Sequence, residues 1–272
     1  MGYILSCTTT PKRIDYLIQL IPHIKPKYKF FVINICGEYR RFGKFKIPKS
    51  LLELCKNNKR VVFNFVNDYG AICKYIGGFN FMKKRGLRFD KLIICDDDTI
   101  YNTDLFYELM DYKTPDNITT GSGFNYDKNR NYNIVEGDKC DMVEGYAGVC
   151  FDYNQYSDFI DFYIGFYKHA NFKSEELIDK YLVASFMGDD FILSYEYKNR
   201  YACKDTRKYV RPLDYAFQED ALHKNNIFGS NMGSYLFLHN NIKILDTFKK
   251  KFYLNQEIKL LSINIVSLKE NL

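Results

Sequence analysis

The segment Leu92-Ile93-Ile94-Cys95-Asp96-Asp97-Asp98-Thr99-Ile100-Tyr101 decides how the rest of the sequence is interpreted. Its apolar first half predicts a buried strand, which runs directly into three consecutive aspartates. Carboxylates this close repel one another and cost stability unless a cation or hydrogen-bond donors neutralise them. A hard divalent ion, Mn²⁺ or Mg²⁺, suits oxygen ligands and can bridge to phosphate. The segment therefore predicts a metal site, with a solvated acidic turn that caps the next helix as the alternative.

The residues before this segment alternate predicted strands with predicted helices. Apolar, β-branched and aromatic runs predict strands at 3–7, 30–35, 61–66 and 92–95, and helical spacing predicts helices at 14–24, 48–55 and 71–82. Such alternation is typical of βαβ units. We therefore expect an α/β fold with a Rossmann-like, mainly parallel sheet flanked by helices. In such sheets ligands bind beyond the carboxyl ends of the strands, where the aspartates lie.

The second half of the sequence is less regular. Its patterns predict helices at 104–112, 156–167, 175–186 and 190–198, and short strands at 118–121, 132–135 and 149–151. Internal repeats and low-complexity linkers are absent from the sequence. We expect a single domain over 1–272, with a first half at 1–102, a smaller mixed second half at 103–245 and a C-terminal segment at 246–272 that docks on the rest.

Composition excludes several classes of function. With 272 residues, 46% of them hydrophobic, the chain can bury a sizeable core. The net charge of +6 suits an anionic ligand, but no dense stripe of Lys and Arg interleaved with aromatics indicates nucleic-acid binding. The eight cysteines form no CxxC pair, which favours a reducing compartment. The sequence has neither a signal-peptide pattern nor a membrane-spanning apolar run, so we expect a cytoplasmic protein.

Four segments together resemble the GT-A glycosyltransferases, including small ones from large DNA viruses and bacteria. The run 92–101 resembles their strand and DxD motif, and Thr9-Thr10-Pro11-Lys12-Arg13 resembles a turn that faces the nucleotide. Asp68-Tyr69-Gly70-Ala71-Ile72-Cys73-Lys74 resembles a segment that contacts the base or sugar-phosphate. Gly188-Asp189-Asp190-Phe191-Ile192-Leu193-Ser194 resembles an acidic pair that opens a helix beneath the acceptor. The resemblance extends over residues 4 to 200 and implies a GT-A fold with a nucleotide-sugar-binding first half.

The resemblance also implies roles for individual residues. The residues expected to bind nucleotide or sugar are Thr9, Thr10, Arg13, Asp68, Lys74, Asp96 and Asp97. Asp98 is expected to ligate the metal, with Asp96 supporting it or holding the ribose, and His239 or His223 is expected to add a ligand. The alternatives are that Lys74 is an ordinary exposed helix lysine and that Arg13 only solvates the first helix.

Asp190 is the candidate catalytic base. In an inverting transfer one carboxylate takes the proton from the acceptor hydroxyl, and the resemblance implies that role for Asp190, with Asp189 beside it. The alternative is a helix cap, in which Asp189 caps the helix and Asp190 favours its dipole. In a retaining enzyme Asp190 would be an acceptor contact. Glu144-Gly145-Tyr146-Ala147-Gly148 resembles a segment whose small residues let the backbone approach the donor sugar, and a simple turn is its alternative.

The resemblance implies a metal-dependent glycosyltransferase that moves a sugar from a nucleotide-diphosphate sugar, UDP rather than GDP, to a hydroxyl acceptor. The acceptor classes are a glycan, a protein or a lipid-linked hydroxyl. The alternatives are a catalytically silent nucleotide-sugar-binding module and a metal-dependent nucleotidyltransferase or phosphohydrolase. The C-terminal segment mixes Lys249–Lys251 with apolar residues, so a dimer contact and a peripheral membrane contact are its alternatives to docking.

Overall fold

The computed structural model of the chain describes residues 2–24, 27–126, 132–156, 159–167, 177–213 and 237–254. The strands are β1 (Tyr3–Thr8), β2 (Phe30–Cys36), β3 (Glu38–Tyr39), β4 (Gly43–Lys44), β5 (Val61–Val66), β6 (Lys91–Ile94), β7 (Thr99–Tyr101), β8 (Ile118–Thr120), β9 (Gly123–Tyr126), β10 (Tyr132–Val135), β11 (Asp138–Lys139), β12 (Met142–Val143), β13 (Val149–Asp152), β14 (Arg200–Ala202) and β15 (Val210–Pro212). The helices are α1 (Ile14–Leu20), α2 (Lys49–Lys56), α3 (Cys73–Arg85), α4 (Thr103–Asp111), α5 (Phe159–Tyr167), α6 (Leu177–Met187) and α7 (Asp189–Glu196), followed by a helical segment over 237–254.

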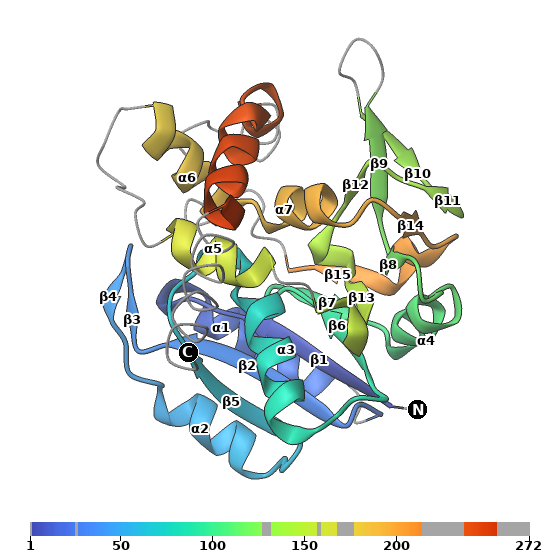
Figure 1. The fold of residues 1–272 in the computed structure, drawn as a ribbon. Helices are drawn as coiled ribbons and strands as arrows, with labels where there is room; N and C mark the ends of the chain where they lie inside the picture. Colours follow the sequence, from blue (N-terminus) through green and yellow to red (C-terminus); the bar gives the residue numbers. More distant parts are fainter. Residues whose placement is uncertain are drawn as a thin grey trace, which may run out of the picture.

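A mixed sheet of eight strands, in the order β11-β14-β8-β13-β6-β1-β2-β5, forms the centre of the fold (Figure 1). Six of these strands run in one direction, because β13 is antiparallel to both β6 and β8 and β11 is antiparallel to β14. The predicted α/β class with a mainly parallel sheet is therefore confirmed. Among the described residues, the smaller antiparallel sheet β10-β9-β12 lies in the second half of the chain, β3-β4 lies in the first half, and β15-β7 joins the two halves.

Both faces of the sheet are buried, which is why its central strands are continuous apolar runs in the sequence. Neighbouring residues of one strand belong to different cores: Ile4 packs in the core that contains α3, α6 and α7, and Leu5 packs in the core that contains α1, α2 and α4. Figure 1 shows α3 lying across β1 and β2, which it contacts extensively. The two helix layers fix the sheet, and with it the carboxyl ends of the strands, where the polar residues follow.

A buried polar group joins α3 to the sheet. The side-chain amide of Asn34 donates to the Ser6 hydroxyl at 2.8 Å and to the Cys7 backbone carbonyl at 2.7 Å. The side-chain amide of Asn64 donates to Asn34 Oδ1 at 2.8 Å. The Ser6 hydroxyl in turn donates to the backbone carbonyl of Lys74 at 2.6 Å. Because each buried polar atom in this group has a partner, it specifies one position of the first turn of α3 on β1.

Most element boundaries agree with the sequence patterns to within a few residues. The predicted helix at 71–82 begins as a 3-10 turn over Gly70–Ile72 before α3, and α3 ends at Gly86 in a left-handed conformation. Several short strands were not predicted, and β7 pairs with β15 from far along the chain. The single-domain division stays a prediction, and residues 255–272 of the predicted C-terminal segment lie outside the described ones. Within the described part of the chain, every helix is too short or too polar to cross a membrane.

Gly70 makes the turn into α3 because it has a φ of +73° and lies against α6. A Cβ at this position would lie 2.0 Å from the backbone oxygen of Phe186, whereas Gly86, with a φ of +64°, has open space around it. We expect Gly86→Ala to lower the free energy of unfolding by about 1–2 kcal/mol through backbone strain alone. Gly70→Ala should lower it by roughly a further 1–3 kcal/mol, because the backbone of α6 must shift.

Urea denaturation of the two variants beside the parent protein measures this difference. The Gly86 variant is the matched control, since both glycines have a left-handed backbone. Equal losses in the two variants would contradict the contact between Gly70 and Phe186.

Candidate functional site

The polar segments that follow β1, β5 and β6 meet at one edge of the sheet, as their positions at strand ends predict. The strand order β6-β1-β2-β5 brings the turn after β1, the loop after β5 and the aspartates after β6 to neighbouring positions. The first turns of α3 and α7 add charged side chains from Lys74 and from Asp189 and Asp190. We define the acidic edge by Arg13, Lys74, Asp96–Asp98 and Asp189–Asp190.

The aspartate triplet is largely buried. Asp97 is 2% exposed and Asp98 is 7% exposed, while Asp96 is more accessible. The following helix, α4, is capped by Asn102, whose side-chain oxygen accepts from the Asp104 N–H at 3.1 Å. The alternative of a solvated acidic turn that caps the next helix is therefore wrong. Burial of neighbouring carboxylates requires nearby positive charge.

Arg13 provides part of that charge. The 3-10 turn Pro11–Arg13 begins with a proline and carries the Arg13 guanidinium to the triplet. Its Nη2 lies 2.7 Å from Asp97 Oδ1, and it also forms an ion pair with Asp98. Arg13 is thus half-buried against carboxylates, and the alternative that it only solvates the first helix is wrong. Burial raises the pKa of Asp97 above its ordinary value, even though Arg13 lowers it.

Lys74 provides the second positive charge, between two groups of carboxylates. Its Nζ lies 2.5 Å from Asp96 Oδ1 and 2.8 Å from Asp189 Oδ2, and the residue is only 3% exposed. The alternative of an exposed helix lysine is therefore wrong. Burial alone would lower the pKa of Lys74, but Asp189, Asp96 and Asp190 raise it well above its ordinary value. Burial opposes ionisation of Asp96, but Lys74 and Arg13 together hold the pKa of Asp96 below its ordinary value.

The acidic pair opens α7 without capping it. Gly188 is the N-cap residue, and the side chain of Asp189 pairs with Lys74, so the interpretation of Asp189 as the helix cap is wrong. Asp190 is half-buried, and its Oδ1 accepts the Gly145 N–H at 2.8 Å. Burial and the neighbouring Asp189 raise the pKa of Asp190 well above its ordinary value, against the effect of Lys74. Burial likewise raises the pKa of Asp189.

Gly145 lies directly against this charged group. It begins the 3-10 turn Gly145–Ala147 between β12 and β13, and a Cβ there would lie 2.8 Å from Asp190 Oδ1 and 2.9 Å from Lys74 Nζ. A residue larger than glycine would therefore displace one of the two charged groups. The turn is more than a connection between strands, and approach of its backbone to a donor sugar stays a prediction.

The acidic edge carries an excess of negative charge that a divalent cation could neutralise. Its five carboxylates outnumber its two basic groups, Arg13 and Lys74, by three when all are ionised. The buried Oδ2 of Asp97 makes no hydrogen bond to a described residue, and neither does the buried hydroxyl of Thr10. Carboxylate oxygens are the ligands that Mg²⁺ and Mn²⁺ prefer, so the residues present fit such an ion.

The other predicted site residues lie around this edge or apart from it. Thr9 is buried, and its carbonyl accepts from the Tyr39 hydroxyl at 2.8 Å. Asp68 accepts the Arg40 N–H at 2.7 Å and the Gly70 N–H at 3.1 Å, which orders the loop before α3. His239 is exposed, and its ring stacks on Tyr126 with centroids 6.5 Å apart. Its role as a metal ligand stays a prediction, and His223 lies outside the described residues.

One polar group beside Gly145 was missed. Arg207 Nε donates to the Ser122 hydroxyl at 2.9 Å, and its Nη2 donates to the Tyr146 hydroxyl at 3.2 Å. The same Nη2 lies 3.5 Å from Glu144 Oε2. Glu144 and Tyr146 belong to the segment 144–148 that the sequence already indicated, but Ser122 and Arg207 come from distant parts of the chain, and no local sequence signal showed that they join it.

Comparison with known proteins shows little similarity in sequence. The sequence matches no protein family model and no curated protein. A solved 4-diphosphocytidyl-2C-methyl-D-erythritol synthase matches 56% of this chain and 75% of its own, with 8% identity and a TM-score of 0.38. A 4-diphosphocytidyl-2C-methyl-D-erythritol synthase from Anaerococcus prevotii matches 88% of this chain and 96% of its own, with 10% identity and a TM-score of 0.41.

The bifunctional glycosyltransferase WbbM matches 74% of this chain and 38% of its own, with 12% identity and a TM-score of 0.36. Scores of this size do not assign an activity or a substrate. The function has to be inferred from the residues of the acidic edge themselves.

The ion pairs of Lys74 predict that its replacement changes the free energy of unfolding in a way that depends on pH. In Lys74→Met, Asp96 and Asp189 lose their buried cation, so at neutral pH we expect the free energy of unfolding to fall by about 3–5 kcal/mol. Without the cation, the pKa of each carboxyl rises above its unfolded value. The loss should therefore shrink as the pH falls toward about 4, where protonated carboxyls need no cation.

Urea unfolding at several pH values tests this expectation. Lys84→Met on the exposed side of α3 is the matched control and should change stability by less than about 0.5 kcal/mol. A loss in Lys74→Met that does not vary with pH would contradict the charge explanation.

The ion pairs of Arg13 predict how Mn²⁺ changes the melting temperature of a variant that lacks this residue. Arg13→Ala leaves Asp97 and Asp98 without their guanidinium, so the variant should melt below the parent protein in a chelating buffer. A divalent ion on the same carboxylates would replace the lost charge. We therefore expect Mn²⁺ to raise the melting temperature of Arg13→Ala more than that of the parent or of the exposed-site control Lys12→Ala. Equal shifts in all three proteins would argue against a cation on the triplet.

Proposed function

We propose that the protein is a metal-dependent glycosyltransferase of the GT-A type that uses a nucleotide-diphosphate sugar. The observation that carries this proposal is the position of Lys74, whose ammonium contacts Asp96 at 2.5 Å and Asp189 at 2.8 Å. In a glycosyl transfer, the leaving diphosphate oxygen and the attacking hydroxyl oxygen flank the same anomeric carbon. A site for this reaction therefore needs its metal-binding carboxylates and its base around the same donor sugar, and the two contacts of Lys74 hold Asp96 and the acidic pair in one site.

The triplet would hold the donor. Asp98 and Asp96 are the proposed ligands of Mn²⁺ or Mg²⁺, an ion that would supply Lewis-acid stabilisation of the departing diphosphate. Asp97, whose Oδ1 lies 2.7 Å from Arg13 Nη2, would contact the nucleotide or the sugar. Arg13 and Lys74 supply further positive charge beside the phosphates.

Two segments would bind the nucleotide. Thr9 and Thr10 lie in the turn after β1, and Asp68 lies in the loop after β5, so both segments border the acidic edge. The buried Thr10 hydroxyl has a hydrogen-bonding capacity that the described residues leave unused. We favour UDP over GDP as the nucleotide, and a glycan, protein or lipid-linked hydroxyl as the acceptor.

Asp190 is the proposed base. Its carboxylate is half-buried and oriented by the Gly145 N–H, and its raised pKa brings it closer to the pH at which a base works best. As the acceptor oxygen forms its bond to the anomeric carbon, its proton passes to the Asp190 carboxylate. The bond from that carbon to the diphosphate breaks, and its electron pair leaves with the diphosphate. Attack from the side opposite the leaving group inverts the configuration.

Thermal unfolding with UDP, GDP and CTP, each with and without Mn²⁺, tests the binding half of the proposal. At about a hundred times its dissociation constant, a nucleotide stabilises the folded protein by roughly 2.7 kcal/mol. We expect UDP to give a shift that requires Mn²⁺. The absence of a metal-dependent shift with every nucleotide would overturn the proposal, and a selective shift with CTP would favour a nucleotidyltransferase.

The Asp190→Asn variant tests the catalytic half. It should keep the UDP shift but lose transfer or hydrolysis of a UDP-sugar by about 10²–10⁴-fold, because the amide cannot accept the proton. Asp138→Asn, at an exposed position, is the control and should retain full activity. Binding without any sugar release in the parent protein would indicate a silent nucleotide-sugar-binding module.

A further inference from the structure

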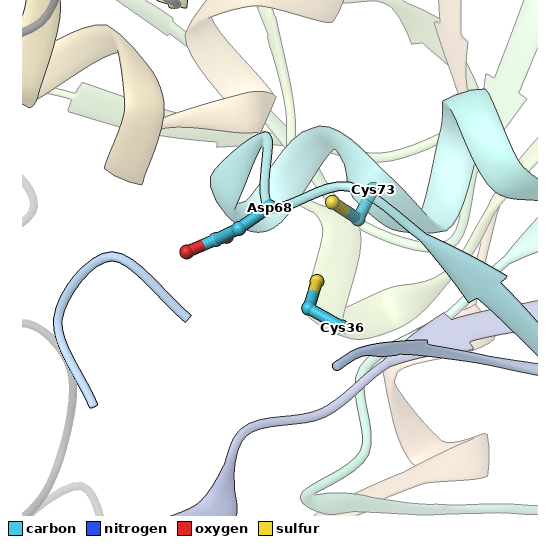
Figure 2. A group of neighbouring side chains, drawn as sticks. All are labelled: Cys36, Asp68 and Cys73. Carbon is cyan, nitrogen blue, oxygen red and sulfur yellow. The ribbon is translucent and has the colours of Figure 1, made fainter. Parts of the chain in front are cut away.

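Two buried thiols and one carboxylate meet beside the acidic edge. Cys36 ends β2, Asp68 follows β5, and Cys73 begins α3. Their two sulfur atoms and one carboxylate oxygen all lie within 4.8 Å of one another. Figure 2 shows the two sulfur atoms turned toward each other, with Asp68 in the adjoining loop. Three donors from three separate elements are thus held together by the tertiary fold.

The surroundings hold these donor atoms in place. Cys73 Sγ accepts the Tyr69 N–H at 3.2 Å and donates to the Asn67 carbonyl at 3.4 Å, so two backbone groups fix its position. Asp68 uses one lone pair on each oxygen, for the Gly70 N–H at 3.1 Å and the Arg40 N–H at 2.7 Å. A carboxylate has about four lone-pair sites, so Asp68 keeps capacity for another partner. Hydrogen bonds that orient ligands in this way are typical of metal sites in proteins.

We propose that Cys36, Asp68 and Cys73 bind a Zn²⁺ ion, separate from the oxygen-ligand site at the triplet. Zn²⁺ binds thiolate sulfur at about 2.3 Å and carboxylate oxygen at about 2.0–2.2 Å, which places tetrahedral ligands roughly 3.5–3.8 Å apart. The three donors therefore need to close by only about 1 Å, and water completes the coordination. Each thiol loses its proton to solvent as its sulfur binds, and no electron is transferred.

The charges and the accessibility of the group favour a thiolate-binding ion. Both cysteines are about 1% exposed, so their sulfurs lie in a dry interior, whereas Asp68 is half-buried. Two thiolates and a carboxylate exceed the charge of Zn²⁺ by one, and the nearby Arg41 guanidinium interacts electrostatically with Asp68. The hard ions expected at the triplet prefer oxygen, so the two sites would select different metals.

An ion at this position would stabilise the start of α3. It would join the end of β2, the loop after β5 and Cys73, which immediately precedes Lys74. Lys74 has to lie between Asp96 and Asp189, so an ion that fixes the residue before it also fixes the acidic edge. This role does not depend on the reaction proposed above.

Cobalt substitution tests the site, because Co²⁺ replaces Zn²⁺ and absorbs in the near ultraviolet only when sulfur ligates it. The full chain, kept reduced with a phosphine, is titrated with Co²⁺. We expect thiolate-to-cobalt absorption that saturates at one ion per chain and disappears when Zn²⁺ is added. Co²⁺ at the triplet would not produce this band, since its ligands there are oxygens.

Four variants assign the band. Cys36→Ser and Cys73→Ser should abolish it, while Cys55→Ser, a buried cysteine of α2, should keep it. Asp68→Asn leaves both thiols in place and should weaken Co²⁺ binding by roughly tenfold or more, which tests the site even if a serine variant does not fold. The proposal is overturned if the parent shows no thiolate band, if the folded serine variants keep it, or if Asp68→Asn binds Co²⁺ as tightly as the parent.

Discussion

The buried ammonium of Lys74 is the interaction on which the candidate site depends. It joins Asp96, at the end of a central strand, to Asp189, at the start of a helix in the second half of the chain. Its backbone carbonyl is held by Ser6, which belongs to the buried polar group of β1 and β2. A buried ammonium costs free energy unless carboxylates neutralise it, and buried carboxylates cost free energy unless a cation neutralises them. Each half of the site therefore stabilises the other, and their separation is set by the reach of one side chain.

Charge balance is the second constraint. Arg13 and Lys74 neutralise only part of the acidic edge, so the remaining carboxyls hold protons or attract cations, and the raised pKa of Asp190 is one consequence. Such a site costs stability in the absence of a ligand, which is typical of functional regions. The excess negative charge favours a divalent ion, and that ion with the two basic residues favours a diphosphate. An acidic site by itself repels an anionic donor. It gains affinity for the donor only when a bound cation reverses the local charge.

The loops around the site are shaped by close packing as well as by charge. Gly70 lets the start of α3 lie against α6, and Gly145 lets its backbone N–H reach Asp190. Asp68 orders the loop before α3, and one of its carboxylate oxygens lies within 4.8 Å of the sulfur atoms of Cys36 and Cys73, the group drawn in Figure 2. A thiolate-bound ion there would stiffen the same turn that precedes Lys74. Polar contacts therefore hold this edge of the sheet in place from the cysteines to the aspartate pair.

The sequence by itself determined the central strands and helices and the position of the triplet at a strand end. Local periodicity and residue type were enough for this, since β5 occupies the predicted residues 61–66. It could not show that Lys74 is buried, that Gly188 and not Asp189 caps α7, or that β7 pairs with β15. These features, like the meeting of Cys36 with Cys73, join residues far apart in the chain or depend on burial. Only the tertiary structure decided them, because contacts between distant segments and their exclusion from water arise when the whole chain packs.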